Sequence, residues 1–280
     1  MITDSQTNFI YLADALRLNY PVFSLQLERV LGNADLHFDF LPLTKDVWAV
    51  DYMPIQLKSN EFLQFKYQPD YLLNTVKWRK TISDTDLICE SIGLKTKKTE
   101  VVLDGGNVVK CEDKVILCDK IFLENPKIGF KKLIIELENM FQSEVIIIPT
   151  HPLDKIGHAD GILRFYDRNT VLINDFSKED RKIEITYKSA LKNAGLDFVE
   201  IPYNPYKNSK NIDATGIYMN YLHVGNIIVL PVFGLEEDEK VVKQFEQLFP
   251  LYQILTVESS ELAQNGGILN CITWNILKAI

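Results

Sequence analysis

A repeat with a period of about 55 residues constrains the fold of this chain more than any other feature. Four short polar turns, near residues 59, 112, 167 and 224, each separate two apolar runs, a pattern that predicts a β-hairpin. Each hairpin is followed by a stretch with helical spacing and then by a short apolar strand. Supersecondary units that repeat in this way bury their apolar faces only against their neighbours.

The elements recur in the same order in every unit. Hairpins are expected over 48–67, 107–118, 161–173 and 218–230, helices over 84–94, 130–141, 185–194 and 236–249, and third strands over 100–103, 144–149, 198–202 and 253–257. A split fifth unit pairs a strand over 268–277 with one over 9–12, followed by a helix over 23–30 and a strand over 36–41. We therefore expect one domain over residues 1–280. It is an α/β propeller of five pseudo-symmetric units, and its terminal strands close the ring and leave no exposed edge.

The composition limits the partners of such a domain. A net charge of −8 argues against nucleic acid and anionic membranes and suits a cationic ligand. No apolar run approaches the roughly 20 residues that span a bilayer, and the first residues lack the pattern of a signal peptide. We therefore expect a cytoplasmic protein. The cysteines and histidines lack metal-binding spacing, so neither a metal nor another cofactor is expected.

Polar side chains recur at one phase of the repeat, the start of the first hairpin strand of each unit. These positions hold Asp51, Asp104 to Asn107, His158 to Asp160, Asn220 and Cys271. Taken alone, Cys271 would be a small buried hydrophobe on an apolar strand that a glycine pair opens. If the units are related by rotation, however, all these positions face a common axis, and Cys271 becomes a candidate nucleophile.

The chemistry of this group predicts a guanidinium substrate. Clustered carboxylates repel one another and lose solvation, so they favour a cation between them. A planar guanidinium matches carboxylates through paired N–H donors, and a thiolate can attack its central carbon. An imidazole can protonate the departing amine and later activate water.

Several segments resemble the agmatine deiminase and bacterial peptidylarginine deiminase family. They span most of the chain, from Trp48 to Trp274, in the family's order. The segments are 48–54, 104–107, 157–160, 218–221, 229–234 and 266–273. The resemblance implies the pentein fold, a five-bladed α/β propeller shared by guanidine-modifying enzymes. It also implies a deiminase that forms an amidino-thioether on cysteine and releases ammonia and a ureido product.

The resemblance also implies roles for individual residues. Cys271 matches the nucleophile, His158 the general acid and base, and Asp160 and Asp51 the carboxylates that grip the guanidinium. Further contacts with the substrate are expected from a second set of residues, namely Asp104, Asn107, Asn220, Trp48 and Gly267.

The chain departs from the family pattern at a few positions. Val50 stands where the family commonly has arginine, Leu269 and Asn270 replace an isoleucine–histidine pair before Cys271, and Trp274 replaces a glutamine. Alternative functions therefore stay open beside an agmatine deiminase: a peptidylarginine deiminase, an amidinotransferase, or a guanidine-binding homologue without catalysis. Homo-oligomerisation also stays open.

Overall fold

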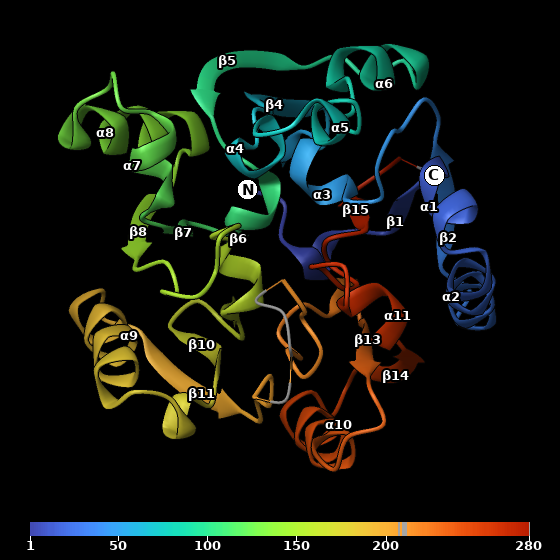
Figure 1. Ribbon diagram of the computed structural model, residues 1–280, viewed down its shortest axis with the longest axis vertical. Coiled ribbons are helices and arrows are strands. Elements are labelled where there is room, and N and C mark those ends of the chain that lie inside the picture. The colour runs from blue at the N-terminus through green and yellow to red at the C-terminus, as the bar shows by residue number, and fades with distance from the viewer. Residues whose placement is uncertain (207, 209–211, 280) are drawn as a thin grey trace.

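The computed structural model describes residues 1–206, 208 and 212–279. Within these residues, fifteen strands form five three-stranded sheets, which follow one another around a ring (Figure 1). In spatial order the sheets are β15 (Thr273–Ile276), β1 (Phe9–Ala13) and β2 (His37–Leu41); β3 (Ile55–Lys58), β4 (Glu61–Lys66) and β5 (Lys97–Val102); β6 (Val109–Lys110), β7 (Lys114–Cys118) and β8 (Glu144–Ile148); β9 (Leu163–Phe165), β10 (Thr170–Asn174) and β11 (Asp197–Ile201); and β12 (Leu222–Val224), β13 (Ile227–Val232) and β14 (Gln253–Glu258). The five-unit α/β propeller expected from the repeat is confirmed.

Every sheet follows the same plan. The middle strand pairs antiparallel with the strand before it and parallel with the strand after the helix; in one unit Val171 lies opposite both Phe165 and Phe198. A parallel neighbour requires a crossover connection, which explains the helix that the sequence places between the second and third strands. The hairpin–helix–strand order is therefore a direct consequence of the sheet topology.

The two ends of the chain close the ring. Strand β1 pairs antiparallel with β15, with Tyr11 opposite Trp274, and parallel with β2. The split fifth unit is therefore present as expected, and it joins the first residues of the fold to the last. Closure also brings the segment before β15, which carries Cys271, to the centre of the ring.

One longer helix per unit lies on the outside of the ring (Figure 1). Asp84 caps the second of these helices, since its side chain accepts hydrogen bonds from the backbone N–H groups of Asp86 and Leu87. The others bury an apolar stripe. In α8, for example, the buried residues Leu133, Leu137 and Phe141 recur every fourth position. The five helices are α2 (Pro21–Asn33), α6 (Thr85–Ser91), α8 (Phe130–Phe141), α9 (Arg181–Asn193) and α10 (Glu237–Leu248).

The first strand of each hairpin begins later than the sequence pattern suggested. Helical turns occupy the expected strand starts, so the prediction that Cys271 lies on a strand is wrong. Around Cys271 the apolar residues Ile268, Leu269 and Ile272 are spaced so that one helical turn places all three on its buried side. The N–H of Ile272 donates a hydrogen bond to the carbonyl of Ile268. Short helical elements missed by the pattern are α1 (Asp14–Asn19), α3 (Ala49–Tyr52), α4 (Asp70–Leu73), α5 (Val76–Arg79), α7 (Lys120–Glu124) and α11 (Ser260–Ala263), with 3-10 turns η1 (Asp4–Gln6), η2 (Gly105–Asn107), η3 (Ala159–Gly161) and η4 (Phe176–Lys178).

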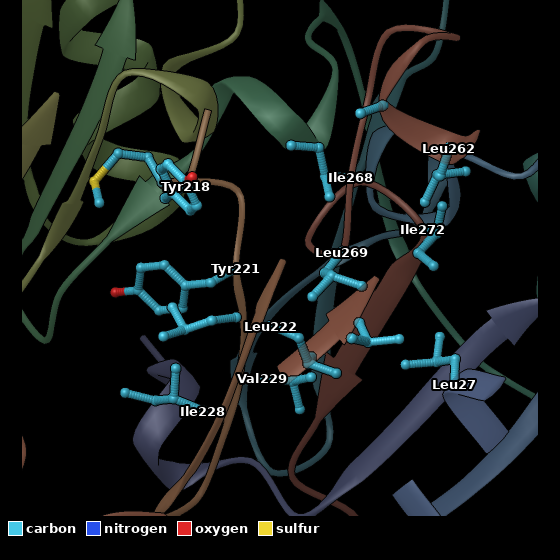
Figure 2. Packing of buried hydrophobic residues seen from close by; sticks show 14 of the residues in the cluster. Leu27, Tyr218, Tyr221, Leu222, Ile228, Val229, Leu262, Ile268, Leu269 and Ile272 are labelled. Carbon is cyan, nitrogen blue, oxygen red and sulfur yellow. The ribbon is translucent and has the colours of Figure 1, made fainter. Parts of the chain in front are cut away.

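The largest apolar cluster anchors the turn that carries Cys271. Ile268, Leu269 and Ile272 are fully buried in the same cluster as Tyr221 and Leu222 (Figure 2). Because close-packed interiors resist displacement, this packing fixes the backbone on both sides of the thiol. Among the described residues, no helix combines the length and apolar character needed to cross a membrane.

Candidate active site

Five turns, one from each unit, bring the candidate residues together at the axis. Each turn comes directly before the first strand of its unit, so the repeat positions all of them equivalently. The turns carry Asp51 in α3, Asp104 before η2, His158 and Asp160 at η3, Asn220 before β12 and Cys271 before β15. All six are buried.

Cys271 lies beside the carboxylate of Asp160. Its Sγ is 3.7 Å from Oδ2 of Asp160. The same oxygen accepts a hydrogen bond from the Asn220 side chain at 2.8 Å and another from the Asn270 side chain at 2.7 Å. The thiol and this carboxylate therefore share one hydrogen-bonded cluster.

Asn220 also shapes the turn that carries Cys271. Its Oδ1 accepts hydrogen bonds from the backbone N–H groups of Cys271 and Ile268, both at 3.2 Å. One carboxamide thus fixes the cysteine backbone with its oxygen and Asp160 with its nitrogen. The structure places Asn220 next to both groups, where it positions them.

His158 lies between two carboxylates. Its Nε2 is 3.2 Å from Oδ2 of Asp104, and its Nδ1 is 3.5 Å from Oδ1 of Asp51. The backbone N–H of Gly106 donates to Oδ1 of Asp51 at 3.1 Å. This arrangement fixes the imidazole ring from both of its nitrogens.

Two glycines leave room for the cluster. A Cβ on Gly106 would lie 2.6 Å from Nδ1 of His158 and 2.7 Å from Oδ1 of Asp51. A Cβ on Gly267 would lie 2.5 Å from the Trp48 ring and 2.9 Å from Cβ of Cys271. Trp48 and Gly267 therefore lie beside Cys271, and their contact with a substrate stays a prediction.

Asn107 is engaged elsewhere. Its Oδ1 accepts a hydrogen bond of 2.7 Å from the backbone N–H of Cys118 in β7, and its Nδ2 lies 3.5 Å from the carbonyl of that residue. The side chain thus ties η2 to its own sheet. This geometry gives the side chain of Asn107 a structural role, and its contact with a substrate stays a prediction.

Burial and mutual repulsion shift the pKa values of the acidic groups upward. Burial raises the pKa of Asp51 to about 7, although the neighbouring His158 opposes the shift. Burial also raises the pKa of Asp160, against the effects of His158 and the Asn270 amide. The pKa of the Cys271 thiol lies well above its usual value because of burial and the charges of Asp160 and Asp51.

The pKa of His158 is raised in spite of burial. Burial alone would lower it, but the charges of Asp51, Asp104 and Asp160 and the hydrogen bond to Asp104 raise it to about 10. The imidazole is therefore protonated at neutral pH. The site thus offers a proton donor beside carboxylates and a protonated thiol, a state that suits the entry of a cation.

The sequence pattern missed Tyr71, whose side chain contacts both His158 and its partner Asp104. Its hydroxyl donates to Oδ2 of Asp104 at 3.1 Å, and its ring meets the His158 ring edge-on at 6.3 Å between centroids. Tyr71 belongs to the short helix α4, which lies between the hairpin and the outer helix of its unit. The helix falls outside the repeated elements, so no periodicity could have indicated it.

The cluster offers no ligand set for a metal ion. Among the described residues, no group of three or more histidine, cysteine or acidic side chains has a geometry that holds a metal ion. The ionisable groups that the structure brings together there are a thiol, an imidazole and carboxylates.

A ring of five α/β units with these groups at its axis is the pentein architecture. The chain belongs to the Porphyromonas-type peptidyl-arginine deiminase family, whose model matches residues 3–276. It is 25% identical over 234 residues to a Mycoplasma mycoides protein named “Putative agmatine deiminase”. That alignment covers 70% of this chain and 63% of the relative, so the chain spans less than two thirds of the relative's length.

Solved structures agree with the fold. The C. jejuni agmatine deiminase superposes with a TM-score of 0.80 at 18% identity, covering 100% of this chain and 96% of the other. A cysteine-to-serine variant of that enzyme with substrate bound superposes with a TM-score of 0.79 at 19% identity, with the same coverage. These similarities establish the pentein fold.

Proposed function

We propose that the protein is a guanidine deiminase that acts on agmatine or a closely related arginine-derived guanidine. The observation that carries the proposal is the buried cluster of Cys271, Asp160, His158 and Asp51, in which a thiol and three further ionisable groups adjoin one another. Buried carboxylates without a matching cation are unfavourable, so the site favours a cationic guest. A guanidinium supplies the charge and the paired N–H donors.

In this proposal Asp160 and Asp51 hold the guanidinium from two sides. Both have pKa values raised by burial, and a bound cation reverses that effect, because an opposite charge nearby favours the ionised form. The same cation favours the thiolate of Cys271, whose pKa is high in the free protein. Substrate binding therefore activates the nucleophile that it meets.

The chemistry then proceeds in two steps. The Cys271 thiol loses its proton to solvent as the cation binds. The sulfur then bonds to the guanidinium carbon, and His158 passes a proton to the nitrogen, whose bond to carbon breaks as it departs as ammonia. The neutral imidazole next takes a proton from water, whose oxygen bonds to the carbon as the carbon–sulfur bond breaks. The oxygen that came from water gives its remaining proton to the departing thiolate, which regenerates the thiol and leaves the carbonyl of a ureido product.

The relatives support agmatine among the guanidines. The names of the Mycoplasma relative and the C. jejuni structure both specify agmatine deiminase, whereas the family model is described by peptidyl-arginine. The test is turnover of agmatine, free arginine and an arginyl peptide, followed as ammonia and as ureido product. We expect agmatine to give the highest kcat/KM.

A matched pair of cysteine variants controls the assay. Cys271→Ser is expected to abolish turnover, while Cys89→Ser, which alters another buried cysteine, is expected to retain it. Absence of turnover on every guanidine by reduced wild-type protein would exclude the proposed activity. Turnover by Cys271→Ser would exclude the proposed nucleophile.

A further inference from the structure

The carboxylate of Asp160 is held through one oxygen. Asn270, Asn220 and Cys271 all contact Oδ2, at 2.7, 2.8 and 3.7 Å. Among the described residues, no hydrogen bond reaches Oδ1. The protein therefore holds Oδ2 through its hydrogen bonds, and Oδ1 is available to a ligand.

A cavity of about 50 Å³ adjoins the same carboxylate. Asp160 and Asn270 line it together with Arg164, Asp4 and Lys110. Arg164 is buried, and its guanidinium is bonded to Asp4 and to the carbonyl of Tyr221. Asp160 and its amide partner Asn270 therefore border the same open space, and the fixed cation of Arg164 lines it with them.

Asp160 is thus exposed to the attraction of two cations, the proposed substrate and Arg164. A side chain that borders open space can change its rotamer, since nothing packs against that side. The two amide donors to Oδ2 are the contacts that oppose such a rotation. A charge-assisted hydrogen bond is about twice as strong as a neutral one, so each amide donor contributes strongly to holding the Asp160 carboxylate in its observed orientation.

The two amides differ in what else they hold. Asn220 also bonds the backbone at Cys271 and Ile268, so its loss would disturb the nucleophile directly. The side chain of Asn270 has its hydrogen bond to Asp160 as its one such contact among the described residues. Replacement of Asn270 therefore changes the restraint on Asp160 while it leaves the other contacts of the turn in place.

We propose that Asn270 is a positioning residue, whose amide holds Oδ2 of Asp160 beside Cys271 against the attraction of Arg164 in the cavity that all three line, so that Oδ1 stays free for the guanidinium. The inference rests on the proposed function, because it assigns Asp160 the task of holding that substrate. It also gives a role to a position at which the chain departs from the pattern that it resembles.

The test compares Asn270→Ala with Asn275→Ala. Asn275 lines the same cavity, but its amide donates to the carbonyl of His223 and not to Asp160. We expect Asn270→Ala to raise KM for agmatine and to lower kcat/KM roughly 10-fold to 100-fold, the effect of losing a hydrogen bond to a charged group. Asn275→Ala is expected to stay near wild type.

A pH profile separates positioning from a structural effect. Loss of a donor to the ionised carboxylate raises the pKa of Asp160, so the acid limb of kcat/KM should move to higher pH in Asn270→Ala alone. Asn270→His, whose ring N–H can also donate, should restore part of the activity. Equal kcat/KM and equal acid limbs in Asn270→Ala and Asn275→Ala would overturn the proposal.

A second readout does not depend on turnover. The charge of Asp160 contributes to the high pKa of Cys271, so a carboxylate that turns away should let Cys271 react at lower pH. Alkylation of Cys271 by iodoacetamide, followed by mass spectrometry across a pH series, measures this. If wild type fails on every guanidine, the proposed function is wrong, and identical alkylation profiles in the two variants would then refute the role of Asn270 separately.

Discussion

The substitution Gly106→Ala tests the geometry around His158 without removing any catalytic group. A Cβ at this position would lie 2.6 Å from Nδ1 of His158 and 2.7 Å from Oδ1 of Asp51. Ordinary contact begins at 3.4 Å, so the two groups must move apart from the methyl by about 0.8 and 0.7 Å. A displacement of about 1 Å in a catalytic group can lower a rate roughly 100-fold.

The backbone of Gly106 has no positive φ angle, so alanine can adopt its conformation. The expected effect therefore falls on kcat/KM for agmatine, with a loss of unfolding free energy of about 1–3 kcal/mol from overpacking. Gly161→Ala is the matched control, because a Cβ there meets nothing within 4 Å in the corresponding turn of the next unit. Activity of Gly106→Ala within about threefold of this control would refute the reasoning.

Further predictions concern protons, the aromatic neighbour and the buried ion pair. Asp51 titrates near 7, burial also raises the pKa of Asp160, and both must be ionised, so kcat/KM should rise steeply up to about pH 7. It should rise further above pH 7, because the Cys271 thiol has a raised pKa and must lose its proton, and the rise should end near pH 10, where His158 loses the proton that it donates; a level profile between about pH 7 and 9 would contradict it. Tyr71→Phe removes one donor to Asp104 and should lower kcat/KM about fivefold, with a melting temperature near wild type; an unchanged rate would exclude this role. Arg164→Met removes the buried guanidinium that pairs with Asp4 and leaves Lys110, 3.8 Å away, as the cation beside that carboxylate. It should lower the urea-derived unfolding free energy by about 1.5–3 kcal/mol, the effect of losing a hydrogen bond to a charged group, whereas Arg168→Met, at an exposed pair, should change it little.

The stability of the free protein should also depend on the charge of His158. Its pKa is raised in the folded state, so its stabilising contribution is complete below the ordinary histidine pKa of about 6.5 and is lost as the pH rises through about 10. The same carboxylates that raise this pKa are those that would hold the substrate. The carboxylates around His158 are therefore the common cause of the proposed substrate binding and of the pH-dependent stability.

The overall fold could be predicted because its units repeat. Each apolar run is buried against the next unit, so the period of the pattern carries the topology, and the repeat alone was enough to pair residues 9–12 with the last strand. The first and last residues of individual strands and helices could be predicted less accurately than the fold. An apolar run such as the one around Ile268 fits either a strand or a helical turn, and only tertiary packing decides between them.

The site could be predicted in part for the same reason. Residues that occupy the repeated phase, such as His158 and Cys271, indicated the axis, and the structure brings them together. Tyr71 lies on a helix outside the repeat, and the orientation of Asn107 toward β7 depends on a backbone partner that no pattern specifies. Asn270 was visible only as a departure from a motif, because its partner Asp160 is 110 positions away in the sequence.

The central claim is that Cys271 forms a covalent bond to a guanidine carbon. The direct measurement is mass spectrometry of protein quenched with acid during turnover of agmatine, followed by peptide mapping. The account predicts an added mass equal to agmatine less ammonia on the peptide that contains Cys271, absent in Cys271→Ser. Undiminished turnover with no adduct on that peptide, or an adduct on another cysteine, would contradict it.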